Sequence, residues 1–265
     1  MKNFLKSELY RILLCNKTIL GVCGVCLTLL LSNSEDLYYC LKYDSGSILY
    51  IFEMVTNGGW FFSIIYLLTA FTSSTGFCED INDRYLYGIL VRTKRSYYCI
   101  SKIIGCFLET MAIVFLGFAC FLGFLSVFLP VIGEPDEIPY IALIPYRTLL
   151  LENKICAYFV IKILLISISA SFWSCIGLML SAMNPDKFLT ISSPFILNYI
   201  ISRLQLYMPD WLNLDYMATG YPIFGNDAGW LCTVIYSFSI YLSLTFLAAY
   251  IFYRRVQGYI NGKNY

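Results

Sequence analysis

The sequence CEDINDRYLYGILVRTKRSYYCISK, residues 78–102, separates two long apolar runs. WFFSIIYLLTAFTSSTGF (60–77) precedes it and IIGCFLETMAIVFLGFACFLGFLSVFL (103–129) follows it. A bilayer is crossed by about 20 mostly apolar residues, so both runs are typical of membrane spans. The segment between them is rich in Lys and Arg, and basic loops stay on the cytoplasmic side of a membrane. The pattern therefore predicts two spans joined by a cytoplasmic loop over residues 78–102.

Apolar residues recur at helical spacing inside this loop, at Ile81, Tyr85, Leu86, Ile89 and Leu90. Acidic residues stand at the front of the series, where carboxylates favour a helix N-terminus. The pattern predicts a short amphipathic helix. Its apolar face must be covered by lipid, by another part of the chain or by a partner protein.

The composition places the whole chain in a membrane. Its 265 residues are 59% hydrophobic and 13% charged, with a mean hydropathy of +0.69, whereas globular chains carry about 25% charged residues. There are 11 Cys and no His. The pair Cys23 and Cys26 lies within an apolar run and has no second pair, which favours buried thiols over a metal site. We therefore expect no metal site and no catalytic residue.

Six apolar stretches predict an all-α polytopic membrane protein with one domain over residues 1–265. The spans are expected at about 18–32, 60–77, 103–129, 155–182, 188–206 and 230–253, with an amphipathic interfacial helix over 1–17. In this topology 13 of the 18 Lys and Arg lie on the inner side and 5 on the outer side. This bias predicts that both termini are cytoplasmic.

The segments expected on the outer side of the membrane also have distinctive sequence features. An acidic loop after the first span holds Glu35, Asp36, Asp44 and Glu53. Residues 207–229 are aromatic and contain Pro and Gly, which indicates a segment that rests in the outer interface or dips partly back into it. Lys162, near the outer end of the fourth span, is expected to extend its charge to the interface.

Polar residues inside the spans are candidates for a substrate path. Glu109 lies one to two turns into the third span, and either pairs with a neighbouring cation or forms a substrate or proton site. Ser167, Ser171 and Ser174 share one stripe of the fourth span. Close helix packing explains this stripe better than a transport route does, because small residues let helices approach each other in lipid.

The inner loop contains the pattern E-D-x-x-x-x-x-x-x-G-I-L-x-R-x-x-R-x-x-Y-x-x-x-K, from Glu79 to Lys102. Together with the interfacial helix and the six spans, it resembles the type-2 ABC exporter permeases. The resemblance is nearest to small bacterial permeases that export antimicrobial peptides or confer immunity to them. It covers the whole chain in layout, while the motif is confined to this loop.

The resemblance implies a coupling helix that docks on a separate ATPase and a partly re-entrant outer hairpin at 207–229. The implied ATPase contact comprises Glu79, Asp80, Ile81, Asp83, Arg84, Tyr85, Gly88, Ile89 and Leu90. The implied assembly holds two ATPase subunits, with ATP and Mg²⁺ bound there, and a second permease that is identical or homologous. It would sit in a bacterial plasma membrane and export an amphipathic peptide or lipophilic compound, with no nucleic-acid partner.

The residues agree with the resemblance on one point. The sequence contains no G-x-x-x-x-G-K-[ST], so no P-loop is present to cradle nucleotide phosphates. Two alternatives remain open, a membrane anchor or sensor subunit that moves nothing and an intramembrane enzyme. An enzyme would need polar residues clustered at a common depth, and the sequence shows no such cluster.

Overall fold

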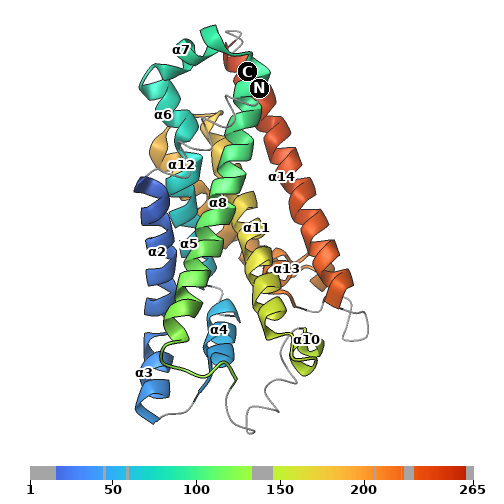
Figure 1. The fold of residues 1–265 in the computed structure, drawn as a ribbon. Helices are drawn as coiled ribbons and strands as arrows, with labels where there is room; N and C mark the ends of the chain where they lie inside the picture. Colours follow the sequence, from blue (N-terminus) through green and yellow to red (C-terminus); the bar gives the residue numbers. More distant parts are fainter. Residues whose placement is uncertain are drawn as a thin grey trace.

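A computed structural model describes residues 16–43, 46–57, 60–132, 146–205, 207–221, 223 and 230–260 (Figure 1). All regular elements in these ranges are helical, which confirms the predicted all-α class. Most of the predicted interfacial helix (1–17), the middle of the outer loop before the fourth span, and residues 222 and 224–229 lie outside the described residues.

The first half of the chain forms α2 (Asn16–Ser32), α3 (Ser34–Tyr43), α4 (Ile48–Asn57), α5 (Trp60–Thr69), the π-helical η1 (Ala70–Ser74), α6 (Gly76–Asn82), α7 (Tyr85–Arg92) and α8 (Arg95–Leu125). The second half forms α10 (Arg147–Leu151), α11 (Ile155–Ser181), α12 (Lys187–Gln205), the 3-10 turn η3 (Asp210–Leu212), α13 (Leu214–Thr219) and α14 (Trp230–Ile260).

Helices occupy all six predicted spans, but not all of them are long enough to cross a bilayer alone. Within the described residues three helices are both long and apolar enough: α8, α11 and α14. A fourth span results if α2 and α3, which are bent by 62° at their junction, count as one. The structure thus supports a membrane protein with three such helices.

The α11 helix lies at the centre of the bundle, packed against α8, α12, α13 and α14. It is mostly apolar around its circumference, as expected of a helix surrounded by protein, and Trp173 and Ile168 are fully enclosed. Gly177 permits the closest approach, because a Cβ there would lie 3.0 Å from both Ser74 Oγ and the Thr190 carbonyl oxygen. α11 is therefore the element on which the other helices are assembled.

The predicted amphipathic helix of the inner loop is two helices in the structure. α6 and α7 are separated by a turn at Arg84, whose φ of 57° is left-handed and ends the α-helical path. Leu86 anchors α7 to a second core that contains Phe77, Tyr98 and Phe252. The α6–α7 hairpin projects from the same end of the bundle as the C-terminal end of α14 (Figure 1).

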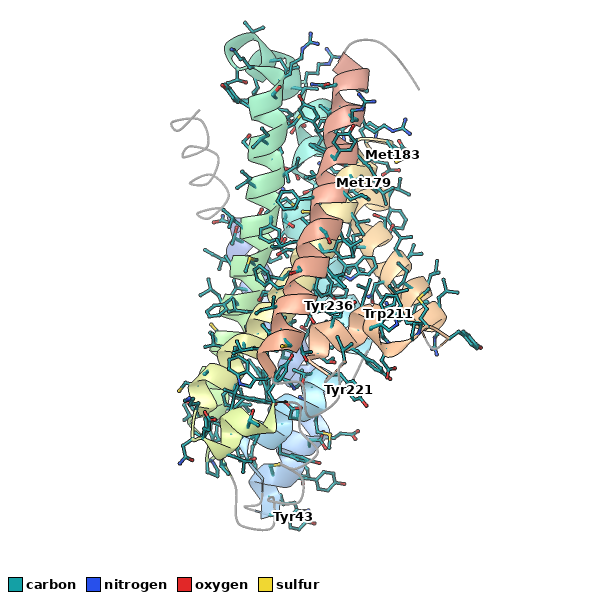
Figure 2. The ribbon with its side chains drawn as sticks, turned by 90° about the vertical axis from the view of Figure 1, so that its right-hand side faces the viewer. Tyr43, Met179, Met183, Trp211, Tyr221 and Tyr236 are labelled. Carbon is teal, nitrogen blue, oxygen red and sulfur yellow. The ribbon has the colours of Figure 1, made fainter. Side chains whose placement is uncertain are left out.

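The segment after α12 folds against the bundle. Asn213 Oδ1 accepts a hydrogen bond from the Tyr216 backbone N–H and so caps α13. Figure 2 shows Trp211 near Tyr236 of α14, whose hydroxyl donates to the Trp211 carbonyl oxygen at 2.9 Å. These contacts hold the described part of the segment beside α14.

Lys162 does not reach the interface as the sequence predicts, and Glu53 is not in an exposed acidic loop. Both side chains are fully buried, with Lys162 Nζ 2.5 Å from Glu53 Oε1. The hydroxyl of Tyr158, one turn before Lys162 on α11, donates to the same carboxylate. Glu53 is buried because α4 packs its apolar face on α8 and α11 and turns this residue toward the core. There only an opposite charge can compensate the negative charge of the carboxylate.

Breaking this pair should destabilise the protein strongly. Lys162→Ala leaves a buried carboxylate without its cation and should cost about 3–5 kcal/mol of unfolding free energy. The double variant Lys162→Met with Glu53→Met should recover most of that loss. Thermal or denaturant unfolding of purified protein measures both. The exposed pair Lys154–Glu152, at 2.7 Å, is the control, and Lys154→Ala should leave stability unchanged.

Candidate functional site

A polar cavity of about 370 Å³ lies beside the α6–α7 hairpin. Most of its lining comes from the start of α2, the π-helical η1, α6 and α8, and α7 and α11 add Tyr85 and Leu178. Its lining includes hydroxyl groups from η1 and six ionisable side chains, Lys17, Glu79, Asp80, Asp83, Lys102 and Glu109. Polar cavities are uncommon within apolar bundles, so this one is the candidate functional site.

The π-helical segment explains why hydroxyls face the cavity. Thr72 and Ser73 donate to the Thr69 carbonyl oxygen at 2.9 and 2.7 Å, competing with the backbone hydrogen bonds of a regular helix. Ser73 Oγ also lies 2.8 Å from Thr110 Oγ1 on α8. π-Helical turns occur frequently at functional sites. Here the turn joins α5 to α8 through hydroxyl groups and widens the helix beside the cavity.

The wall between α6 and α8 is an ion pair. Asp80 Oδ2 lies 2.7 Å from Lys102 Nζ and accepts a hydrogen bond of 2.7 Å from the Tyr98 hydroxyl. All three side chains are buried. Tyr98 and Lys102 are four residues apart on α8, as Tyr158 and Lys162 are on α11. The chain therefore uses the same tyrosine–lysine arrangement twice to neutralise a buried carboxylate.

The outer part of the cavity is held by a more exposed pair. Lys17 Nζ lies 2.5 Å from Glu79 Oε1, and Thr75 donates to the same oxygen at 3.1 Å. Partial burial alone would raise the pKa of Glu79, but the hydrogen bond and charge of Lys17 outweigh it and hold this pKa below its usual value. Glu79 therefore stays ionised at neutral pH and fixes the start of α2 to α6.

Glu109 lines the cavity and is buried. Thr18 Oγ1 donates to its Oε1 at 3.3 Å. Among the described residues no Lys or Arg nitrogen lies within 4.0 Å of this carboxyl, so it is not a member of an ion pair as one sequence interpretation proposed. Four carboxyl groups thus line a cavity that holds two lysines, and the excess favours a cationic ligand group or a proton.

The residues predicted to contact an ATPase divide into two groups. Asp80 is enclosed by its ion pair, and Ile81, Ile89 and Leu90 are partly buried against the second core. Asp83, Arg84, Tyr85 and Gly88 are exposed, as is Val91, which the sequence interpretation left out. The ATPase contact stays a prediction, and its exposed apolar residues are Tyr85 and Val91.

The serine stripe of α11 lies within helix packing. Ser167 and Ser171 donate to carbonyl oxygens one turn back, and Ser171 also donates to the Phe107 carbonyl oxygen at 3.1 Å. Ser174 donates to Thr69 Oγ1, and its own carbonyl oxygen accepts from Ser74. None of the three serines lines the polar cavity. Their hydroxyls serve to join helices.

Sequence reasoning found Glu109 and the acidic residues of α6 but missed Lys17, Thr72, Ser73 and Lys102 as cavity residues. One signal was available: the run TSST at 72–75 is the only stretch of four consecutive hydroxyl residues in the chain. Comparison of the chain with family models, curated proteins and solved structures gives no match. The chemistry that the cavity can support is therefore inferred from its geometry alone.

The acidic excess predicts a charge preference in labelling. Thr72→Cys, in protein whose exposed native cysteines are replaced by Ser, should react about tenfold faster with a trimethylammonium methanethiosulfonate than with the sulfonate analogue, since the local potential concentrates cations. Adding Glu109→Gln should reduce the ratio. Thr69→Cys, buried outside the cavity, is the control and should react slowly with both. Equal rates of the two reagents at Thr72→Cys contradict the prediction.

Proposed function

We propose that this chain is the membrane-spanning permease subunit of an ATP-driven exporter whose ATPase is a separate chain. The observation that carries the proposal is the α6–α7 hairpin. Leu86 fixes α7 to the bundle, and the helix exposes Tyr85, which is 63% exposed at the edge of the polar cavity, and Val91, which is 88% exposed near its other end. An apolar surface of this kind on a projecting helix suits a groove in a partner protein.

The hairpin also connects this surface to the polar cavity. α6 follows η1 directly and contributes Glu79 and Asp80 to the cavity lining, while Asp80 is bound to Lys102 of α8. A force applied to α7 by an ATPase therefore acts on the α6–α8 wall through one short, charged contact. The cavity would open or narrow in response, which is the coupling that a permease requires.

The cavity bears on the substrate class. Its acidic excess supports a cationic group on the transported molecule, and the apolar helices around it support an amphipathic one. A membrane-active peptide or a lipophilic cation combines both properties. Since the sequence has no P-loop, ATP and Mg²⁺ would bind to the partner ATPase. We also propose two ATPases and two permeases in the assembly, in a bacterial plasma membrane.

The proposed topology has six spans with both termini cytoplasmic. α8, α11 and α14 supply three of them, and α2 with α3 supplies a fourth. α5 with η1 is the fifth, and α12 is the sixth. The excess of Lys and Arg at the α7 end supports the orientation.

Disrupting the exposed face of α7 should release the ATPase. Tyr85→Asp with Val91→Asp replaces two apolar contacts worth about 1.5–3 kcal/mol each, so binding should weaken by more than about 100-fold. The measurement is co-purification of ABC ATPase subunits with the tagged chain from its native membrane, with substrate-stimulated ATP hydrolysis as a second readout. Substitutions at Ile89 and Leu90 are less informative because these side chains also pack on the chain's own core.

Tyr39→Asp with Tyr43→Asp is the matched control at the opposite end of the bundle, where both tyrosines are exposed. It should leave ATPase binding intact. If the α7 variant retains its ATPase and its substrate response, the coupling role is wrong. If no ATPase co-purifies even with the unaltered chain, the anchor or sensor alternative replaces the proposal.

The orientation can be tested with two residues of equal exposure. Tyr43 and Tyr85 are each 63% exposed, on α3 and α7. In intact cells a membrane-impermeant maleimide should label Tyr43→Cys and should label Tyr85→Cys only after permeabilisation. The exposed native cysteines Cys23, Cys120, Cys156 and Cys232 are first replaced by Ser, whereas Cys40 and Cys99 are buried and add little background. Labelling of Tyr85→Cys from outside reverses the proposed topology.

A further inference from the structure

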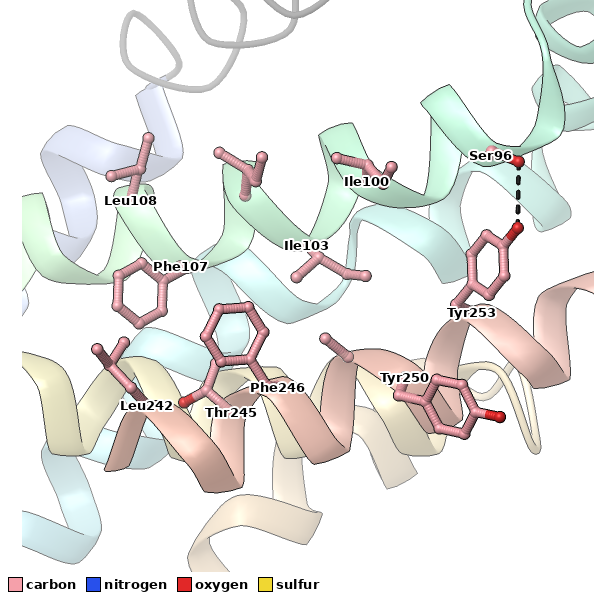
Figure 3. A pocket seen from close by; sticks show the side chains of 12 residues that line it. Ser96, Ile100, Ile103, Phe107, Leu108, Leu242, Thr245, Phe246, Tyr250 and Tyr253 are labelled. Atoms are coloured by element: carbon pink, nitrogen blue, oxygen red, sulfur yellow. Dashed lines mark hydrogen bonds between the residues drawn. The ribbon is translucent and has the colours of Figure 1, made fainter. Parts of the chain in front are cut away.

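A second cavity of about 580 Å³ lies between α8 and α14 and has no place in the proposed coupling (Figure 3). Its lining is hydrocarbon almost throughout, including Ile100, Ile103, Phe107, Leu242, Phe246 and Ala249. The Thr245 hydroxyl donates to the Tyr241 carbonyl oxygen at 2.7 Å, so this residue adds no free polar group. We call this cavity the α8–α14 groove.

The groove ends at a polar contact near the α7 end of the bundle. Ser96 Oγ and the Tyr253 hydroxyl lie 3.1 Å apart and join the two helices, as Figure 3 shows. Cations flank this contact in the sequence, with Lys94 two residues before Ser96 and Arg254 directly after Tyr253. Both are exposed, and the Arg254 guanidinium lies 6.0 Å from the ring centroid of Tyr250, which lines the groove.

Negative charge is scarce around the groove. α14 contains no Asp or Glu, and the one acidic residue of α8, Glu109, lines the polar cavity. α8 also begins at Arg95 without a side-chain cap, while the N–H groups of Tyr97 and Tyr98 donate to the Lys94 carbonyl oxygen. The groove therefore combines a long hydrocarbon surface with a positively charged end.

We propose that the α8–α14 groove binds one acyl chain of an anionic phospholipid, with the lipid phosphate at Lys94 and Arg254. The ligand has the same polarity as the groove, an apolar chain that ends in an anion. Both helices are long and apolar enough to lie in a bilayer, which supplies such lipids along their whole length. With the proposed orientation, the lipid belongs to the cytoplasmic leaflet.

The test uses purified protein in phosphatidylcholine vesicles that contain traces of photoactivatable lipid. Phosphatidylglycerol and phosphatidylcholine carrying the same diazirine-labelled acyl chain are compared. The phosphatidylglycerol probe should crosslink at least about fivefold more, since two cations attract it. Mass spectrometry should find the label on α14 near Phe246 and Ala249. Equal labelling by the two lipids overturns the proposal.

Two sets of variants separate the acyl chain from the headgroup. Ala249→Phe fills the groove and should abolish labelling there, whereas Ala119→Phe, exposed on α8 outside the groove, should not. Ala249→Leu serves if the larger residue prevents folding. Lys94→Gln with Arg254→Gln should remove the preference for phosphatidylglycerol while labelling persists. If Ala249→Phe instead lowers the dimer fraction and leaves lipid labelling unchanged, a second copy of the chain covers the groove and the proposal is wrong.

Discussion

Charge inside an apolar bundle must be neutralised within the bundle, and this constraint organises the structure. In the part of the chain that the structure describes, two lysines are buried, and each pairs with one carboxylate that also accepts a hydrogen bond from a tyrosine hydroxyl. An unpaired charge in such surroundings costs several kcal/mol or more, so the pairs dictate which helices are neighbours. Lys162 joins α11 to α4 through Glu53, and Lys102 joins α8 to α6 through Asp80.

The two ion pairs differ in whether a cavity lies beside them. Around Lys162 and Glu53 the aromatic rings of Phe52 and Tyr158 fill the remaining space, and the site is a closed part of the core. Around Lys102 and Asp80 the π-helical turn and the start of α2 leave an open polar cavity. The same arrangement therefore stabilises the fold at one place and forms a wall of the candidate site at the other. The proposed movement from α7 to the cavity would pass through this α6–α8 contact.

Small and hydroxylated residues perform a second structural task. Gly177, Ser74 and the serines of α11 let η1, α8 and α12 approach the central helix closely, and their hydroxyls donate to carbonyl oxygens on neighbouring or preceding turns. In lipid such contacts replace the hydrophobic effect as the source of helix association. The stripe that resembled a transport path in the sequence is thus better explained by packing, while α14, with its lighter packing, leaves the apolar groove beside α8.

The sequence by itself determined the helical class, the positions of the three helices long enough to cross a membrane, and the polar loop between α5 and α8. These features follow from local hydrophobicity and helical period, which each segment carries without reference to the others. Tertiary structure alone decided that Glu53 and Lys162 meet across 109 residues, that Asp80 is enclosed while Tyr85 and Val91 are exposed, and that Lys17 and Glu109 line one cavity. Pairing of distant charges depends on which helix faces come together. A linear pattern of hydrophobicity contains no information on that choice. A charged residue that will be buried in an ion pair looks the same in the sequence as one that will be exposed to solvent.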